Sequence, residues 1–213
     1  MNNKLVISLM EKPRRVYPPG CVTEWVEHPY PPNRRREAVE VGFVMEHRFA
    51  FYYWINCKQK LQRDRRTNEM IDDERFMPPD LVTWDWHDDC GADSDVVEEK
   101  LAMLNQADEQ EVGLYCWAGL CQLNDGQILP AVWLNALGNV YIIQKQKRDY
   151  KRQNRTFRDC HGHEHYIFYF RSLNDFARAF EQTSSNTGVI WDIDLDYFTR
   201  TKAVPDQRYT PAL

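Results

Sequence analysis

Two short apolar segments of this chain end in alternating acidic residues, and this feature constrains the fold most. The first, residues 81–86 (LVTWDW), runs into the pattern Asp85-x-His87-x-Asp89. Side chains two residues apart share one face of a strand, roughly 6.5–7 Å from one another. Asp85 and His87 can therefore point the same way, and Asp89 joins them if the chain turns near Gly91. Two carboxylates and an imidazole there would suit Mn²⁺ or another borderline divalent cation.

The second segment, residues 188–191, continues into Asp192, Asp194 and Asp196. Three like charges on one face of a buried strand repel one another and are costly unless they are paired. A bound cation is the simplest compensation. The alternative is that Asp192 and Asp194 cap a turn while the other groups face solvent. Two such motifs in one chain favour the metal-binding interpretation.

Strand and helix candidates alternate along the chain. Expected strands are 39–45, 81–86, 140–144, 165–170 and 188–194, and expected helices are 48–61, 96–106, 109–123 and 173–182. We expect loops at 62–80 and at the basic run 145–158, whereas the apolar segment 128–137 is ambiguous. The alternation predicts a three-layer α/β fold with a mostly parallel sheet, in which sites form beyond the carboxyl ends of the strands.

Composition bounds the class of protein. The 213 residues predict a single domain over 1–213, with an irregular Pro- and Arg-rich arm over 1–38. A formal net charge of −5 argues against a general nucleic-acid binder. No apolar run is long enough to span a membrane, and the N-terminus lacks signal-peptide features, so we expect a cytoplasmic protein without membrane contact. The six cysteines form no CxxC pair and are expected to be free thiols.

In chain order, the acidic motifs resemble those of the arginase/agmatinase/deacetylase superfamily. Its manganese ureohydrolases carry an early His, then Asp-x-His-x-Asp, then a late Asp-x-Asp. The residues in the same order here are His47, Asp85, His87, Asp89, Asp192 and Asp194. A closer resemblance is to a divergent arginase-like branch that includes the peptide arginases. Matching features are Glu46 before the early His, the Pro130 segment and residues 192–198 (DIDLDYF), so that the resemblance covers roughly 40–200.

The resemblance implies an arginase-like fold, trimmed at the C-terminus, with a binuclear Mn²⁺ site. His47 and Asp89 would bind one ion, His87 and Asp194 the other, with Asp85 and Asp192 bridging the two. The implied activity is hydrolysis of arginine side chains to ornithine and urea. The implied partner is a ribosomally made precursor peptide with a leader sequence. The expected catalytic residues are Asp85, His87, Asp192, Asp194 and His163.

The chain also departs from the longer ureohydrolases. Their guanidinium-binding Glu follows Asp-x-Asp, but residues 199–213 contain no Glu. Their proton-shuttle His lies soon after Asp-x-His-x-Asp, but the next histidine here is His161. The cluster of His161, His163 and His165 could supply the shuttle, bind a separate metal or form a solvated loop.

Three interpretations stay open from the sequence. Glu46 could orient His47, Asp196 has no settled role, and the basic run 145–158 could dock an acidic leader peptide or form a solvated loop. The alternatives to a peptide arginase are a hydrolase of a small guanidino compound and a non-catalytic, metal-stabilised peptide-binding module.

Overall fold

The structure, a computed structural model, describes residues 22–27, 38–63, 69–87, 89–91, 96–120, 125–145, 153–184 and 188–198. Most of the expected arm 1–38 lies outside these residues, as do Cys21, Cys121 and the middle of the basic run. The described strands are β1 (Val22–Glu27), β2 (Ala38–Phe43), β3 (Asp80–Asp85), β4 (Val140–Gln144), β5 (Arg155–Arg158), β6 (Glu164–Phe170) and β7 (Val189–Ile193). The α-helices are α2 (Ala50–Gln62), α3 (Glu98–Met103), α4 (Glu109–Ala118), α5 (Ile128–Trp133) and α6 (Leu173–Thr183). Short 3-10 helices are η1 (His47–Phe49), η2 (Asp73–Arg75) and η4 (Leu195–Phe198).

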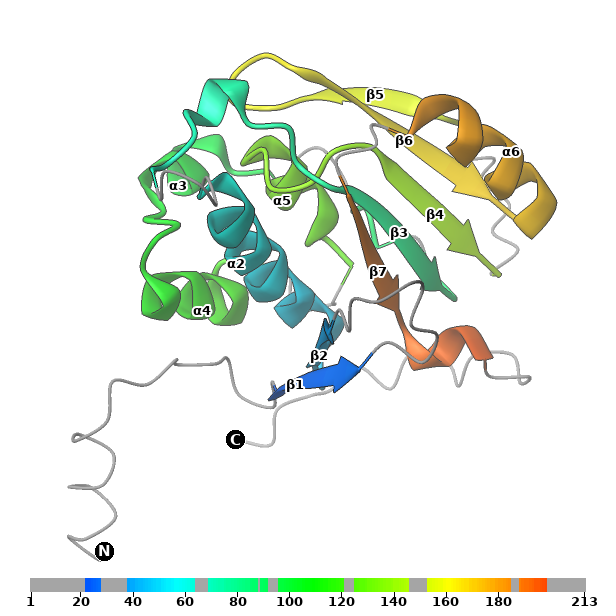
Figure 1. The fold of residues 1–213 in the computed structure, drawn as a ribbon, viewed down its shortest axis with the longest axis horizontal. Coiled ribbons are helices and arrows are strands. Elements are labelled where there is room, and N and C mark those ends of the chain that lie inside the picture. Colours follow the sequence, from blue (N-terminus) through cyan, green and yellow to red (C-terminus); the bar gives the residue numbers. More distant parts are fainter. Residues whose placement is uncertain are drawn as a thin grey trace, which may run out of the picture.

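A five-stranded sheet forms the centre of the fold, with the strand order β5-β6-β4-β3-β7 (Figure 1). Strand β3 pairs in parallel with β4 and β7, and β4 pairs in parallel with β6, whereas β5 is antiparallel to β6. The predicted α/β class with a mostly parallel sheet is therefore confirmed. Strands β1 and β2 form a separate antiparallel pair.

Two hydrophobic clusters lie on the opposite faces of the sheet. The larger one packs α2, α4 and α5 against one face through residues such as Phe51, Ile55 and Ile142. The smaller one packs α6 against the other face, where Phe176 and Phe180 surround Tyr141 of β4. The sheet is thus a layer between helices, and the two ends of each strand remain available for polar groups.

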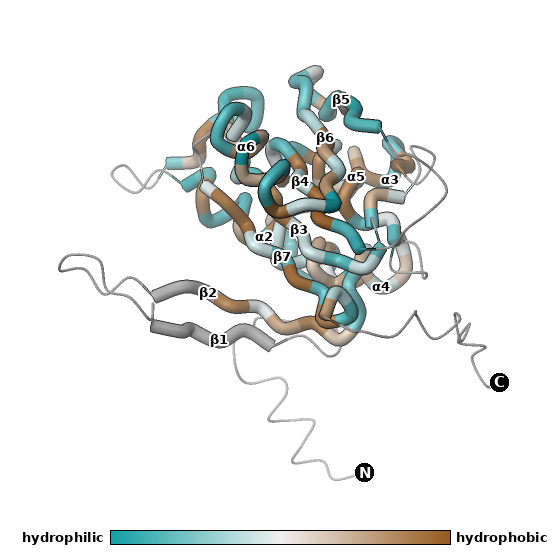
Figure 2. Tube along the Cα trace, turned by 90° about the vertical axis from the view of Figure 1, so that its right-hand side faces the viewer, coloured by the Kyte–Doolittle hydropathy of each residue, from teal (hydrophilic) through white to brown (hydrophobic). Residues whose placement is uncertain are grey.

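Two segments differ from the sequence-based expectations. The ambiguous segment 128–137 begins as helix α5, with Pro130 inside its first turn, where a missing N–H costs nothing. The end of the basic run, expected to be a loop, forms the edge strand β5. Thr156 and Arg158 of this strand face solvent, whereas Arg155 is half-buried and donates to Cys90 Sγ. Figure 2 shows the hydrophilic character of β5.

None of the described helices combines the length and the apolar character that crossing a membrane requires. Among the described cysteines, Cys57, Cys90, Cys116 and Cys160 form no disulfide bond with one another.

Candidate metal centre

The sheet topology brings the two acidic motifs together. Strands β3 and β7 are parallel neighbours, with Thr83 opposite Asp192 and Trp84 opposite Ile193. Both motifs follow strands that end at the same edge of the sheet, and the Asp194 N–H donates to the Trp84 carbonyl at 2.9 Å. Segments more than 100 residues apart in the sequence thus meet at the carboxyl ends of adjacent strands, where α/β folds place their sites.

His47 reaches this end of the strands from the helix layer on the α2 side of the sheet, because it begins the helical segment that leads into α2. The Phe49 N–H donates to the Glu46 carbonyl at 2.9 Å, which begins the 3-10 turn at His47. Phe49 is buried and stacks on Trp117 at 6.1 Å between ring centroids. This apolar anchor fixes the turn, so that the imidazole of His47, with a side chain only 7% exposed, lies among the carboxylates.

Four side chains form the first group that could hold a cation: His47, Asp85, Asp89 and Asp194. One ligand atom from each lies within 4.8 Å of the others. Nδ1 of His47 is 3.0 Å from Asp85 Oδ2 and 3.5 Å from Asp194 Oδ2, and it also contacts Asp89 Oδ2. The expected turn after β3 is present, since Asp89 has a φ of 44° and Gly91 a φ of 62°.

The contact between His47 and Asp85 lacks a hydrogen bond. Nδ1 of His47 and Oδ2 of Asp85 are both buried and both without a hydrogen-bond partner, although they lie 3.0 Å apart. Buried polar atoms are rarely left unpaired, because each one costs about 1–3 kcal/mol. A divalent cation between these atoms would satisfy both at once. The residues of this group therefore fit a metal ion.

A second group consists of Asp85, His87 and Asp196. Nδ1 of His87 lies 3.2 Å from Asp196 Oδ2 and 3.5 Å from Asp85 Oδ1. Asp85 therefore belongs to both groups and contacts an imidazole with each of its oxygens. The backbone N–H of Trp86 donates to Asp196 Oδ1 at 3.0 Å, and the backbone N–H of His87 donates to Asp85 Oδ1 at 2.6 Å. The geometry gives Asp196 the position that the sequence left unassigned.

Asp192 differs from its expected bridging role. Its Oδ2 accepts a hydrogen bond from Nε2–H of His47 at 2.7 Å and another from the Thr83 hydroxyl at 3.3 Å. Asp192 is thus on the far side of the imidazole from Asp85. A carboxylate on one imidazole nitrogen fixes the tautomer and turns the other nitrogen towards the metal position. Asp192 thus contacts the ring of a candidate ligand and belongs to neither group of potential ligands.

Sequence reasoning missed Gln127, which precedes α5. Gln127 is fully buried, and its Nε2–H donates to Asp89 Oδ2 at 3.2 Å. A polar residue directly before the apolar run 128–132 was the available signal. Its contact with Asp89 shows that α5 helps to position this carboxylate.

The pKa values at this centre show how strongly its groups interact. Burial alone would lower the pKa of His47, but the charge of Asp192 and its hydrogen bond outweigh burial and raise it. The hydrogen bond with Asp196 raises the pKa of His87 to about 10. Burial raises the pKa of Asp89 to about 8 and also raises that of Asp194. Burial would likewise raise the pKa of Asp85, but the neighbouring imidazoles lower it. Without a cation, protons must compensate the crowded carboxylates.

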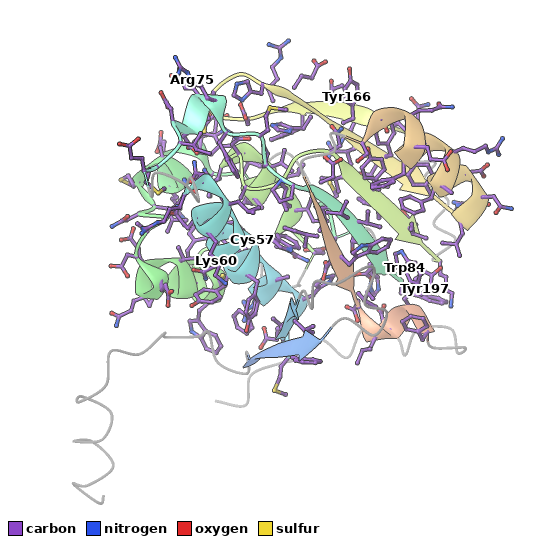
Figure 3. All side chains as sticks on the ribbon, viewed as in Figure 1. Cys57, Lys60, Arg75, Trp84, Tyr166 and Tyr197 are labelled. Carbon is purple, nitrogen blue, oxygen red and sulfur yellow. The ribbon has the colours of Figure 1, made fainter. Side chains whose placement is uncertain are left out.

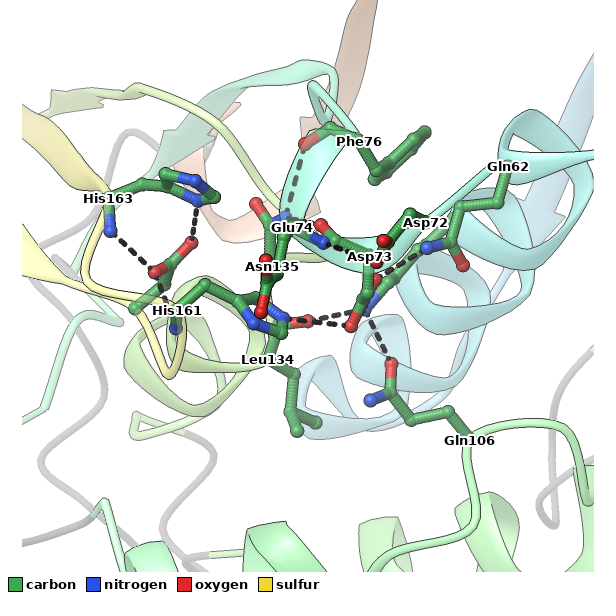
Figure 4. A network of polar contacts seen from close by, with 12 residues as sticks. Gln62, Asp72, Asp73, Glu74, Phe76, Gln106, Leu134, Asn135, His161 and His163 are labelled. Atoms are coloured by element: carbon green, nitrogen blue, oxygen red, sulfur yellow. Dashed lines mark hydrogen bonds and ion pairs between the residues drawn. The ribbon is translucent and has the colours of Figure 1, made fainter. Parts of the chain in front are cut away.

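The three clustered histidines lie at the other end of the sheet. His163 and His165 flank the first residue of β6, and this strand runs parallel to β4, so that both lie at the amino ends. The rings of His163 and His165 donate to Asp159 at 2.9 and 3.1 Å. His161 donates to Asp73 at 3.0 Å, and Figure 4 labels both of these residues. Because β6 is seven residues long, the amino and carboxyl ends of the strands lie roughly 20 Å apart. His163 therefore lies away from the candidate metal centre, and this position does not support its expected role as proton shuttle.

Glu46 also has a different partner from the expected one. Its carboxylate pairs with Arg48 at 2.6 Å and makes no described contact with the His47 ring. The guanidinium of Arg48 lies over the rings of Phe49 and Trp117, at 5.2 and 5.5 Å. Glu46 thus stabilises the anchor of the turn that carries His47.

Neither the known protein families nor the curated proteins contain a match to this chain.

Proposed function

We propose that this chain is a divalent-metal-dependent hydrolase that acts on the guanidinium of peptide arginines and releases urea. The observation that carries the proposal is the buried carboxylate of Asp85, which belongs to two adjacent groups of metal-ligating side chains. A shared carboxylate is the arrangement expected when two cations lie side by side. The ligand positions at the carboxyl ends of neighbouring parallel strands also support an arginase-like fold.

The donor set favours two Mn²⁺ ions over softer metals. The two groups offer imidazole nitrogens and carboxylate oxygens, without a thiolate. His47, Asp89 and Asp194 would hold one ion, His87 and Asp196 the other, and Asp85 would contact both. The chemistry that such a pair supplies is a water nucleophile of lowered pKa.

The residues of the chain prepare the centre for a cationic substrate. Five carboxylates gather there: Asp85, Asp89, Asp192, Asp194 and Asp196. Their negative charge exceeds by one unit the positive charge of two divalent ions, so the occupied centre would attract a guanidinium. Hydrolysis adds water to the guanidinium carbon Cζ, breaks the bond between Cζ and Nε of the arginine, and leaves urea and a primary amine.

A peptide substrate is favoured over free arginine by the exposure of the second group. The side chain of His87 is 38% exposed and that of Asp196 33%, whereas His47 and Asp85 are enclosed. A cationic side chain can reach this open side while the rest of the peptide stays outside. A small guanidino compound would use no such surface.

The test is urea release from an arginine-containing peptide by Mn²⁺-loaded protein, with mass spectrometry to detect ornithine. We expect Asp85→Asn and excess chelator to abolish release, while the distant Asp159→Asn retains it. Full activity in excess chelator would refute the proposal. Equal or faster turnover of free agmatine or arginine would indicate a small-molecule hydrolase. Metal-dependent stabilisation without urea from any guanidine would indicate a binding module.

A further inference from the structure

Strand β7 carries part of the candidate metal centre and lies at the edge of the sheet (Figure 1). It pairs in parallel with β3 on one side, and the Gly188 carbonyl accepts from the Asp80 N–H at 3.0 Å. Since the N–H of Asp194 also bonds to β3, the alternation assigns the backbone groups of Ile190 and Asp192 to that side. The N–H and C=O groups of Val189, Trp191 and Ile193 therefore point to the outer edge. Within the described ranges, no strand pairs with that edge.

The outer edge of β7 carries no lysine or proline, and its one charged residue, Asp192, points to the α2 side. Natural edge strands carry lysines, prolines or bulges that prevent pairing with another chain. The segment Val189–Ile193 (VIWDI) contains neither lysine nor proline and is rich in residues that favour strands. The other edge of the sheet differs, because β5 carries arginines at both ends.

The two faces of β7 have different chemistry. Asp192 contacts His47 and so points to the α2 side, where the metal centre lies. Trp191 packs edge-on against Trp84 and Phe176 and so points to the α6 side. On that side Trp191 is 56% exposed and Ile193 49%. The ring of Trp84 also packs against that of Tyr197 beyond the strand end, and Figure 3 labels both side chains.

We infer that an extended peptide adds as a strand to the outer edge of β7 and presents an arginine on its α2 side. This inference rests on the proposed function and names its substrate class, an arginine flanked on both sides by apolar residues. Residues that alternate along an added strand face opposite sides of the sheet. The flanking residues would cover Trp191 and Ile193, and the arginine would lie beside Asp192.

Charge and distance both fit this occupant. Directly opposed residues on paired strands have Cβ atoms about 4.5–5.5 Å apart, so an arginine opposite Asp192 starts next to the centre. The excess of carboxylates there attracts its guanidinium. An apolar strand without a cation would cover the α6 side but leave this attraction unused.

The first test uses Thr-Val-Arg-Val-Thr-amide with fluorescein on its N-terminus and Mn²⁺-loaded full-length protein, with binding followed by fluorescence anisotropy. Versions with a single backbone N-methyl group, placed on successive residues, remove one donor each. An added strand directs every second N–H to β7, so binding should fall at alternate positions and persist at the others. Loss at the valines indicates antiparallel addition and loss at the arginine parallel addition. A uniform response along the peptide would overturn the inference.

The second test changes the protein. Trp191→Pro removes an outward N–H but no hydrogen bond to β3, whereas Trp191→Val keeps the N–H and serves as the control. We expect the proline variant to lose peptide binding and the valine variant to retain most of it. Mn²⁺-dependent thermal shifts would verify that both variants keep the centre. Equal binding by both variants would contradict strand addition.

Two further measurements separate the possible failures. Amide hydrogen exchange should show Val189, Trp191 and Ile193 unprotected in the free protein and protected by the peptide. Protection in the free monomer, or a dimer that Trp191→Pro dissociates, would assign the edge to the chain itself or to a second copy and overturn the inference. Urea release that is insensitive to N-methylation would refute strand addition but leave the hydrolase function standing. Binding that falls at alternate N-methylated positions, without any release of urea, would support strand addition but refute the hydrolase function.

Discussion

Asp192 and His47 are joined by a 2.7 Å hydrogen bond to Nε2, on the opposite side of the imidazole from Asp85 and Asp89. The two residues are 145 positions apart in the sequence. The bond leaves Nδ1 directed at the buried carboxylates, and this is the orientation that a metal ligand requires. It therefore links the late acidic motif to the early histidine.

Replacing Asp192 by Asn should weaken metal binding without removing it. The amide can no longer hold Nε2–H of His47 as a charged acceptor, and loss of such a partner typically lowers affinity by about 10–100-fold. Isothermal titration with Mn²⁺ measures the change. Asp175→Asn, on the exposed surface of α6, is the control. An unchanged affinity would show that His47 is fixed by other contacts.

Substitutions of Asp85 and Asp196 should differ in how many metal ions the protein still binds. Asp85 belongs to both ligand groups, so Asp85→Asn should abolish binding of both ions. Asp196 belongs to the second group alone, so Asp196→Asn should leave the first ion bound. Metal content after gel filtration gives the stoichiometry. Equal loss in the two variants would contradict the assignment of a shared Asp85.

Divalent metal should stabilise the fold. Its binding to the native state alone adds about 2.7 kcal/mol at a concentration 100 times the Kd. We expect Mn²⁺ to raise the melting temperature and a chelator to lower it. Once the chelator removes the metal, no cation compensates the crowded carboxylates. Calorimetric scans with and without Mn²⁺ measure the shift. A melting temperature that does not respond to either would argue against a site in the folded protein.

His163 should have no part in the metal centre, since it lies at the amino end of β6 beside Asp159. His163→Ala is expected to keep the Mn²⁺ affinity and the urea release of the unmodified protein, while lowering thermal stability. Its effect on the melting temperature checks that the substitution acts locally. Loss of hydrolysis with an unchanged melting temperature would restore the shuttle role.

The network around Lys58 should make the protein less stable in acid. Lys58 is buried in α2 and binds Asp73 at 2.8 Å and the Leu134 carbonyl at 2.6 Å. Figure 4 labels these two partners. Burial would raise the pKa of Asp73, but the hydrogen bond and charge of Lys58 lower it below its ordinary value of 3.8. A lowered carboxyl pKa contributes stability above the unfolded-state value, and that contribution is lost as the pH falls through 3.8 towards the folded-state value.

Asp73→Asn should therefore flatten the stability profile below pH 4. It should also cost about 1–3 kcal/mol at neutral pH, because it leaves the buried ammonium without its charged partner. Urea denaturation at a series of pH values measures both effects, with Asp72→Asn as the exposed neighbouring control. An identical slope in the variant and the unmodified protein would contradict the role assigned to this pair.

Local sequence patterns predicted much of this protein. The alternation of apolar segments indicated an α/β fold, because the period of apolar residues depends on local backbone geometry. The two acidic motifs were recognised because strand geometry places alternate residues on one face. Segment 155–158 was missed because its arginines mask the strand pattern, and pairing with β6 decides that it becomes β5.

The sequence by itself determined which side chains could bind a cation, since residue type and spacing fix the chemistry of each motif. Only the tertiary structure decided how they divide the work. It placed β7 beside β3 and brought Asp192 to Nε2 of His47 and Asp196 to His87. It also placed His163 at the amino ends of the strands, away from the candidate metal centre. These relationships depend on strand order and on the direction of each strand. Such long-range pairings follow from packing of the whole sheet and leave no local signal in the chain.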